Sequence, residues 1–228
     1  SRGHMRALPR RTLGIWDIMR SCCSLAQGQR TGNRCEGITT QRARAGASAK
    51  PAQPAGYYRH LNFPTRRYRP DQGQARWRRG VYMHWQRQFL HPMLRAFDAP
   101  TREECTAQRP ISNTPLAALT LLNDPVFVEA ARAFAQRALQ VEVAPDRDRI
   151  RWAMREATAR TPRPAEVDVL ARVLAAARRH FRDDPRAAAA LLAVGDAARD
   201  TSLAAPEHAA WTQVMRVILT LREMICRD

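Results

Sequence analysis

Apolar side chains recur at helical spacing along most of residues 78–228. The longest example is the stripe formed by Val167, Leu170, Leu174, Ala177 and Phe181. Because residues three, four and seven positions apart lie on one face of an α-helix, this stripe predicts a helix that ends near residue 183. No stretch alternates apolar and polar residues in the way that predicts a strand. The pattern therefore predicts an all-α fold, an irregular bundle of about six to eight helices.

Prolines that follow a polar side chain mark where several helices begin. Asn113-Thr114-Pro115 and Asn123-Asp124-Pro125 predict two consecutive helices, because a polar cap binds free backbone amides and proline is tolerated in the first turn. Asp184-Pro185 predicts a further short helix that closes near Gly195. The other expected helices are a stripe from Val81 to Phe89 that ends at His91-Pro92, one capped by Asp146 that runs to Arg160, and a last one from Pro206 through Leu221 to Ile225.

The N-terminal third differs in character from the rest of the chain. Residues 1–45 are rich in Gly, Ser, Thr, Gln and Arg and lack a helical or strand period, so we expect a disordered or non-native basic arm. Residues 51–77 carry frequent prolines among aromatic side chains, which prevents a long helix and favours an extended segment wrapped over the core. Residues 46–228 are expected to form a single helical domain.

The formal net charge of +17 comes mainly from residues 1–80, which hold 17 basic and 3 acidic side chains. Residues 81–228 hold 21 and 18, so the helical part of the chain is close to neutral. A basic arm suggests contact with nucleic acid, but Trp16 is the only aromatic ring among its arginines that could stack on a base. No segment has the run of roughly 18 apolar residues that a membrane helix needs, and residues 1–20 lack the apolar core of a signal peptide.

The cysteines and histidines do not predict a metal or haem site. The five cysteines contain no C-x-x-C or C-x-x-C-H motif, and the six histidines are not spaced as zinc ligands. We therefore expect no metal and no cofactor in this chain. Trp85 and Trp211 lie on apolar stripes, and we expect both to be core residues and not platforms for a ligand.

One cluster of polar residues between positions 98 and 124 is the best candidate for a site. The catalytic candidates are Asp98, Arg102, Glu103 and Cys105, and the binding candidates are Arg109, Asn113, Asn123 and Asp124. Carboxylates could perform acid–base chemistry, arginine could bind an anionic substrate, and the thiol could be a nucleophile. In the structural alternative, Asp98 and Asp124 cap helices and Cys105 packs as a small apolar side chain. The structural alternative is favoured because it needs no further assumption.

Several segments resemble a known family in the right order. They are KPAQPAGYYRHLNFP, RRGVYMHWQR, FDAPTREECT, SNTPLAALTLLNDP, FVEAARAFAQRAL, ARTPRPAEVDVL, LLAVGDAARDTSL and EHAAWTQVMRVILTLREMI. Together they resemble the C-terminal domain of unknown function 1553 of planctomycete secreted, cytochrome c-associated proteins, over about residues 46–228. The family's usual Leu-Asn-Leu-Asp-Glu ending is replaced here by Leu-Thr-Leu-Arg-Glu at residues 219–223.

The resemblance implies a setting but no reaction. It implies an extracytoplasmic protein, periplasmic or at the cell surface, in which a signal peptide and a cytochrome c-like domain precede this one. Any haem would belong to that separate domain, and the other domains of the full-length protein would be the partners.

Three functions are compatible with the sequence. The first is a helical structural or interaction module of a large exported bacterial protein. The second is a catalytic domain that acts on surface carbohydrate or in a cytochrome-linked redox chain, and the third is a nucleic-acid binder. We favour the first, because no catalytic spacing is recognised and the positive charge lies outside the helical body.

Overall fold

The computed structural model describes residues 48–54, 56–57, 68–76, 82–85, 90–100, 114–141 and 145–225. In these ranges the regular structure is helical, and the only β-type pairing is an isolated bridge between Ala49 and Met83. The predicted all-α class is thereby confirmed. None of the described helices is both long enough and apolar enough to cross a membrane. The predicted basic arm, residues 1–45, lies outside the described ranges.

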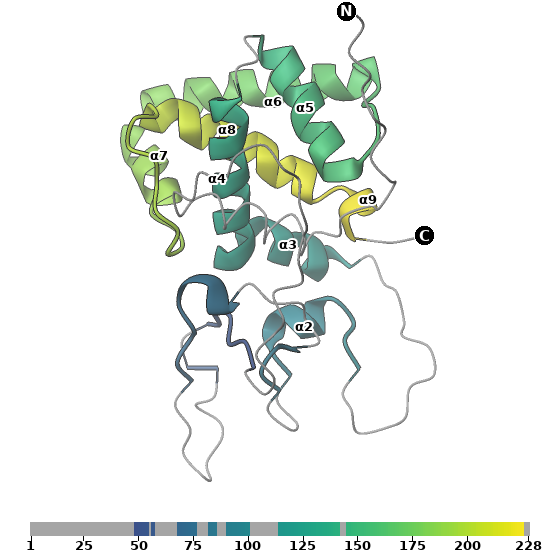
Figure 1. Cartoon of the computed structure of the whole chain (residues 1–228), viewed down its shortest axis with the longest axis vertical. Coiled ribbons are helices and arrows are strands. Elements are labelled where there is room, and N and C mark those ends of the chain that lie inside the picture. The colour runs from purple at the N-terminus through teal and green to yellow at the C-terminus, as the bar shows by residue number, and fades with distance from the viewer. Residues whose placement is uncertain are drawn as a thin grey trace, which may run out of the picture.

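The described elements run in the following order. They are the 3-10 helix η1 (Gly73–Arg76) and the α-helices α2 (Pro92–Ala96), α3 (Pro115–Asn123), α4 (Pro125–Gln140), α5 (Asp146–Thr158), α6 (Pro164–Asp183), α7 (Pro185–Leu192), α8 (Ala205–Leu219) and α9 (Arg222–Ile225). Figure 1 shows α4 and α8 crossing at the centre, with α5 and α6 above them, α7 at one side, and α3 and α2 below. The bundle is built around this central crossing.

The polar caps predicted before proline are present. The Thr114 hydroxyl accepts a hydrogen bond from the amide of Ala117 (3.2 Å), and the Asp124 carboxylate accepts one from Val126 (2.9 Å). Asp184 caps α7 in the same way. Each cap satisfies one of the amides that the first helical turn leaves free. At each of these three helix starts, the capping side chain and the amide that it binds are therefore at most three positions apart.

The predicted stripe on α6 is buried in full, and Trp211 of α8 is completely buried. Trp85 is partly buried against the core, as expected of a packing residue. Nearly every side of α4 is covered by its neighbours, and the covered side chains include the polar residues Glu129, Arg132 and Gln136.

The helix predicted from Val81 to Phe89 is wrong where the structure describes it. Residues 82–85 contain no α-helix, because their backbone groups pair with a residue more than 30 positions earlier. The amide of Ala49 donates to the carbonyl of Tyr82 (2.8 Å), and the amide of His84 donates to the carbonyl of Ala49 (2.7 Å). His91-Pro92 does not end a helix but begins α2, with His91 as its N-cap.

The boundaries of three predicted helices also need correction. Asp146 is the first residue of α5 and not its cap, since its carboxylate pairs with Arg178 of α6 (2.5 Å). That helix ends at Thr158, before a left-handed Ala159, and α7 ends at Leu192, ahead of Gly195. The predicted last helix is broken into α8 and α9 at residues 220–221. Apart from this break, the errors lie at helix ends, where competing side-chain partners and short turns decide the boundary.

The proline-rich segment lies against the helical part in its described portions. The amide of Lys50 donates to the carboxylate of Asp71 (2.8 Å), which closes a loop of this segment on itself. The Tyr57 hydroxyl donates to the carbonyl of Leu90 (2.8 Å), ahead of α2. The extended character predicted from the prolines is confirmed here.

Candidate functional site

The residues of the predicted polar cluster fall into two groups. Arg102, Glu103, Cys105, Arg109 and Asn113 lie outside the described residues. Asp98, Asn123 and Asp124 are described, so the structure can be compared with the prediction at these three positions.

Asp124 occupies the corner between α3 and α4. Its amide donates to the carbonyl of Thr120 (2.9 Å) at the end of α3, while its carboxylate caps α4. Burial raises the pKa of this carboxyl, and the amide of Val126 and the positive charge of Arg76 oppose that change. Asn123, the last residue of α3, is exposed. The Asp124 carboxylate is therefore held by the backbone that it caps.

Asp98 follows α2 and adopts a left-handed conformation with φ of +53°. Its amide donates to the carbonyl of Arg95 (3.3 Å), so Asp98 closes α2 and starts no described helix. The neighbouring Phe97 ring meets the Phe127 ring of α4 edge-on, with centroids 5.9 Å apart. This contact joins α2 to the start of α4. Residues 101–113, which follow Asp98, lie outside the described ranges, so the helix cap predicted for Asp98 stays a prediction.

A buried ion pair that we did not predict joins distant parts of the chain. The Arg76 guanidinium of η1 lies 2.7 Å from one carboxylate oxygen of Glu129 on α4, and both side chains are almost fully buried. The other oxygen of Glu129 accepts from the amide of Ala197 (2.7 Å), and Arg76 also reaches Asp196 (3.1 Å). The buried charges are thus paired and hydrogen-bonded, as burial of charge requires.

Other polar side chains of α4 also form hydrogen bonds to the loop between α7 and α8. Arg132 donates to the carbonyl of Ala197 (2.6 Å), and the side chain of Gln136 accepts from the amide of Asp200 (3.2 Å). Glu129, Arg132 and Gln136 are spaced i, i+3 and i+7, which puts them on one side of the helix. A polar stripe at this spacing inside an apolar helix was the signal in the sequence that could have revealed the loop contact.

Two of the described histidines are buried. The ring of His208 on α8 is fully buried and lies 3.0 Å from the carbonyl of Arg132, and burial lowers its pKa. His91 is 3% exposed, and its Nδ1 accepts from the amide of Met93 (3.3 Å). Burial, with a smaller effect of His84, lowers the pKa of His91 to about 4. Both rings are therefore neutral at pH 7.

The described residues offer no group of three His, Cys, Asp or Glu side chains that could hold a metal ion. His84 and His91 do share a neighbour, since the Tyr68 ring lies 6.4 Å from the first and 6.3 Å from the second. The Tyr68 hydroxyl donates to the carbonyl of Pro51 (2.6 Å). This aromatic group therefore holds the proline-rich segment against the start of α2.

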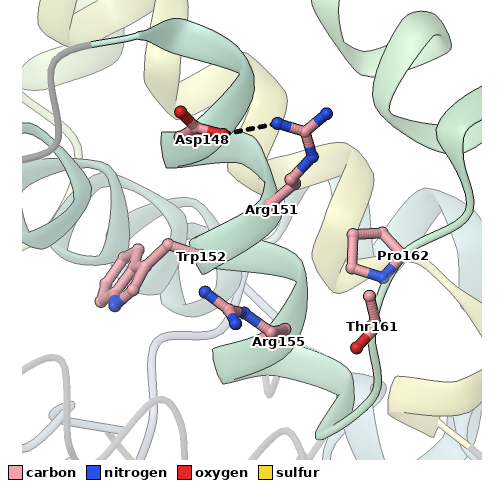
Figure 2. A pocket seen from close by; sticks show the side chains of 6 residues that line it. All are labelled: Asp148, Arg151, Trp152, Arg155, Thr161 and Pro162. Carbon is pink, nitrogen blue, oxygen red and sulfur yellow. Dashed lines mark hydrogen bonds and ion pairs between the residues drawn. The ribbon is translucent and has the colours of Figure 1, made fainter. Parts of the chain in front are cut away.

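A hollow of about 210 Å³ lies along α5 (Figure 2). Four of its lining residues come from α5 and two from the turn that leads to α6, namely Asp148, Arg151, Trp152, Arg155, Thr161 and Pro162. The hollow thus combines an indole and a proline ring with two guanidinium groups and one carboxylate. The sequence prediction missed it, because no residue of the candidate cluster contributes to it.

Comparison with known families finds a match. Residues 36–174 match the family described as "Protein of unknown function (DUF1553)". The match covers more than half of the chain and ends within α6, so the chain belongs to this family. The predicted resemblance to a domain of unknown function is confirmed over those residues. No curated protein and no solved structure matches the chain.

Proposed function

We propose that this member of the DUF1553 family is a helical structural or interaction module of a larger exported bacterial protein. It would act through contacts with neighbouring domains and not by catalysing a reaction. The observation that supports this proposal most directly is that several buried or half-buried polar residues have structural roles. Asp124 caps a helix, Glu129 and Arg76 neutralise each other in the core, and His208 binds a backbone carbonyl.

The setting of the module is part of the same proposal. The sequence resemblance to secreted planctomycete proteins supports a periplasmic or cell-surface location. It also supports a cytochrome c-like domain of the full-length protein as a partner, in which case the haem is held by that domain. The Tyr57 hydroxyl joins the proline-rich segment to the carbonyl of Leu90, and this contact would suit a domain that receives the chain from a preceding one.

The binding test uses this chain and the remainder of its full-length protein, produced separately. Isothermal titration calorimetry should show saturable one-to-one binding between them. Cell fractionation of the native host, followed by immunoblotting, should place the full-length protein outside the cytoplasm. Absence of binding would contradict the interaction module, and a cytoplasmic protein would contradict the exported setting.

The competing catalytic function has a separate test. Asp124→Asn keeps a cap acceptor but removes the carboxylate, so the fold should survive the change. If a reaction is found in the wild-type chain and disappears in this variant at unchanged thermal stability, Asp124 is a catalytic group. That result would replace the proposal of an interaction module.

A further inference from the structure

The hollow on α5 has a rigid aromatic wall. The indole of Trp152 lies 5.9 Å from the ring of Phe134, centroid to centroid, and the guanidinium of Arg137 lies 5.6 Å from the indole. Arg137 is held in turn by Glu156 (3.3 Å). Trp152 is half-buried, so these contacts fix the indole while part of it remains open to the hollow. An aromatic side chain fixed in this way loses little entropy when a ligand packs on it.

The two arginines that line the hollow differ in whether they form an ion pair. Arg151 forms an ion pair with Asp148 (2.5 Å), which Figure 2 marks with a dashed line. Arg155 is exposed, and no carboxylate of the described residues lies within ion-pair distance of it. Figure 2 shows its guanidinium directed to the same side of α5 as Trp152. A guanidinium in this position presents its planar fork to a carboxylate or a similar anion.

The combination of groups narrows the class of ligand. An arginine without a carboxylate partner among the described residues favours an anion, and the indole favours an apolar flat face. The Asp148 carboxylate accepts hydrogen bonds, so it favours a ligand that also carries hydroxyl donors. A hollow of about 210 Å³ lies below the roughly 300–1,000 Å³ of typical ligand pockets, which suits one small ring and not a large cofactor.

We propose that this hollow binds the carboxylated sugar units of an acidic polysaccharide. The Arg155 guanidinium pairs with the uronate carboxylate, the Trp152 indole packs against the C–H face of the ring, and the Asp148 carboxylate accepts hydrogen bonds from ring hydroxyls. This inference goes beyond the proposed function, because that function concerns other domains of the same protein and needs no carbohydrate.

The test titrates the whole chain with trigalacturonate and, separately, with uncharged maltotriose and with citrate. The key variant is Arg155→Gln, which removes the charge from an exposed side chain and should leave the fold intact. The matched control is Arg186→Gln, which removes an exposed arginine from α7, on the opposite side of the bundle from α5 (Figure 1). Isothermal titration calorimetry gives the affinities, and thermal melting of each variant checks its fold.

We expect trigalacturonate to bind and maltotriose and citrate to bind at least about tenfold more weakly, a factor that corresponds to about 1.4 kcal/mol. Arg155→Gln should weaken trigalacturonate binding by a similar factor, whereas Arg186→Gln should bind as the wild type does. The proposal is overturned if trigalacturonate does not bind or if citrate binds equally well. It is also overturned if the two arginine variants lose the same affinity, since that would show attraction by net charge alone. Binding of trigalacturonate without any binding to neighbouring domains would support this site while contradicting the proposed module.

Discussion

Acidification should destabilise the fold through the buried ring of His91. His91 is 3% exposed at the start of α2, and its pKa is lowered from 6.5 to about 4, chiefly by burial. In the unfolded chain the imidazole returns to its ordinary pKa. Between these two values the unfolded state binds a proton that the folded state does not, so stability rises with pH in this window. The stabilisation is therefore lost as the pH falls below about 6.5, and the loss levels off below about 4.

The size of the effect follows from the same two values. Between pH 8 and pH 5 the free energy of unfolding should fall by about 2 kcal/mol through His91, and the full loss below pH 4 is about 3 kcal/mol. A loss of that size is a substantial fraction of the ~5–15 kcal/mol by which domains are usually stable.

The assay compares urea unfolding at pH 8 and pH 5 for the wild type and for His91→Asn. Asparagine does not titrate, and its side-chain oxygen can accept from the Met93 amide in place of Nδ1. Burial also lowers the pKa of His208, and that contribution is common to both proteins, so it cancels in the comparison. His180→Asn, a change at an exposed histidine of α6, is the matched control.

We expect His91→Asn to lose about 2 kcal/mol less than the wild type between the two pH values. The His180→Asn control should keep the larger loss. If wild type and His91→Asn lose the same free energy, the ring of His91 is not held neutral by burial, and the reasoning from its environment is refuted.

Three further predictions concern the cap of α4, the close approach of Gly195 to Glu129, and the buried ion pair. Asp124→Ala should lower the free energy of unfolding by about 0.5–2 kcal/mol through loss of the α4 cap, measured by chemical denaturation, and a gain in stability would contradict the structural role. Gly195→Ala should cost at least about 1 kcal/mol, because φ is +89° and a Cβ atom would collide with the Glu129 side chain; an unchanged melting temperature would refute this. Arg76→Met leaves the buried Glu129 carboxylate without its ion-pair partner and should cost about 3–5 kcal/mol. A double-mutant cycle with Glu129→Gln should then show strong coupling between the two, whereas additive losses would contradict the ion pair.

The sequence alone was sufficient wherever structure depends on near neighbours. The caps at Thr114, Asp124 and Asp184 each bind an amide two or three positions away. The polar residue and the proline that follows it were therefore enough to predict where each helix begins. The apolar stripe of α6 was predicted in full for the same reason, since a helix repeats over three to four residues. The all-α class and the membership in a family of unknown function also followed from the residues.

Tertiary structure decided everything that depends on partners far apart in the chain. Residues 82–85 carry a helical pattern, yet backbone hydrogen bonds join Tyr82 and His84 to Ala49, and no α-helix forms there. Arg76 and Glu129 are 53 positions apart, and the site on α5 needs Trp152 to be fixed by a ring from α4. Local spacing specifies which face a side chain occupies on its own helix. Which group from elsewhere meets that face is determined only when the helices pack, because desolvation and pairing of charges act through space and not along the sequence.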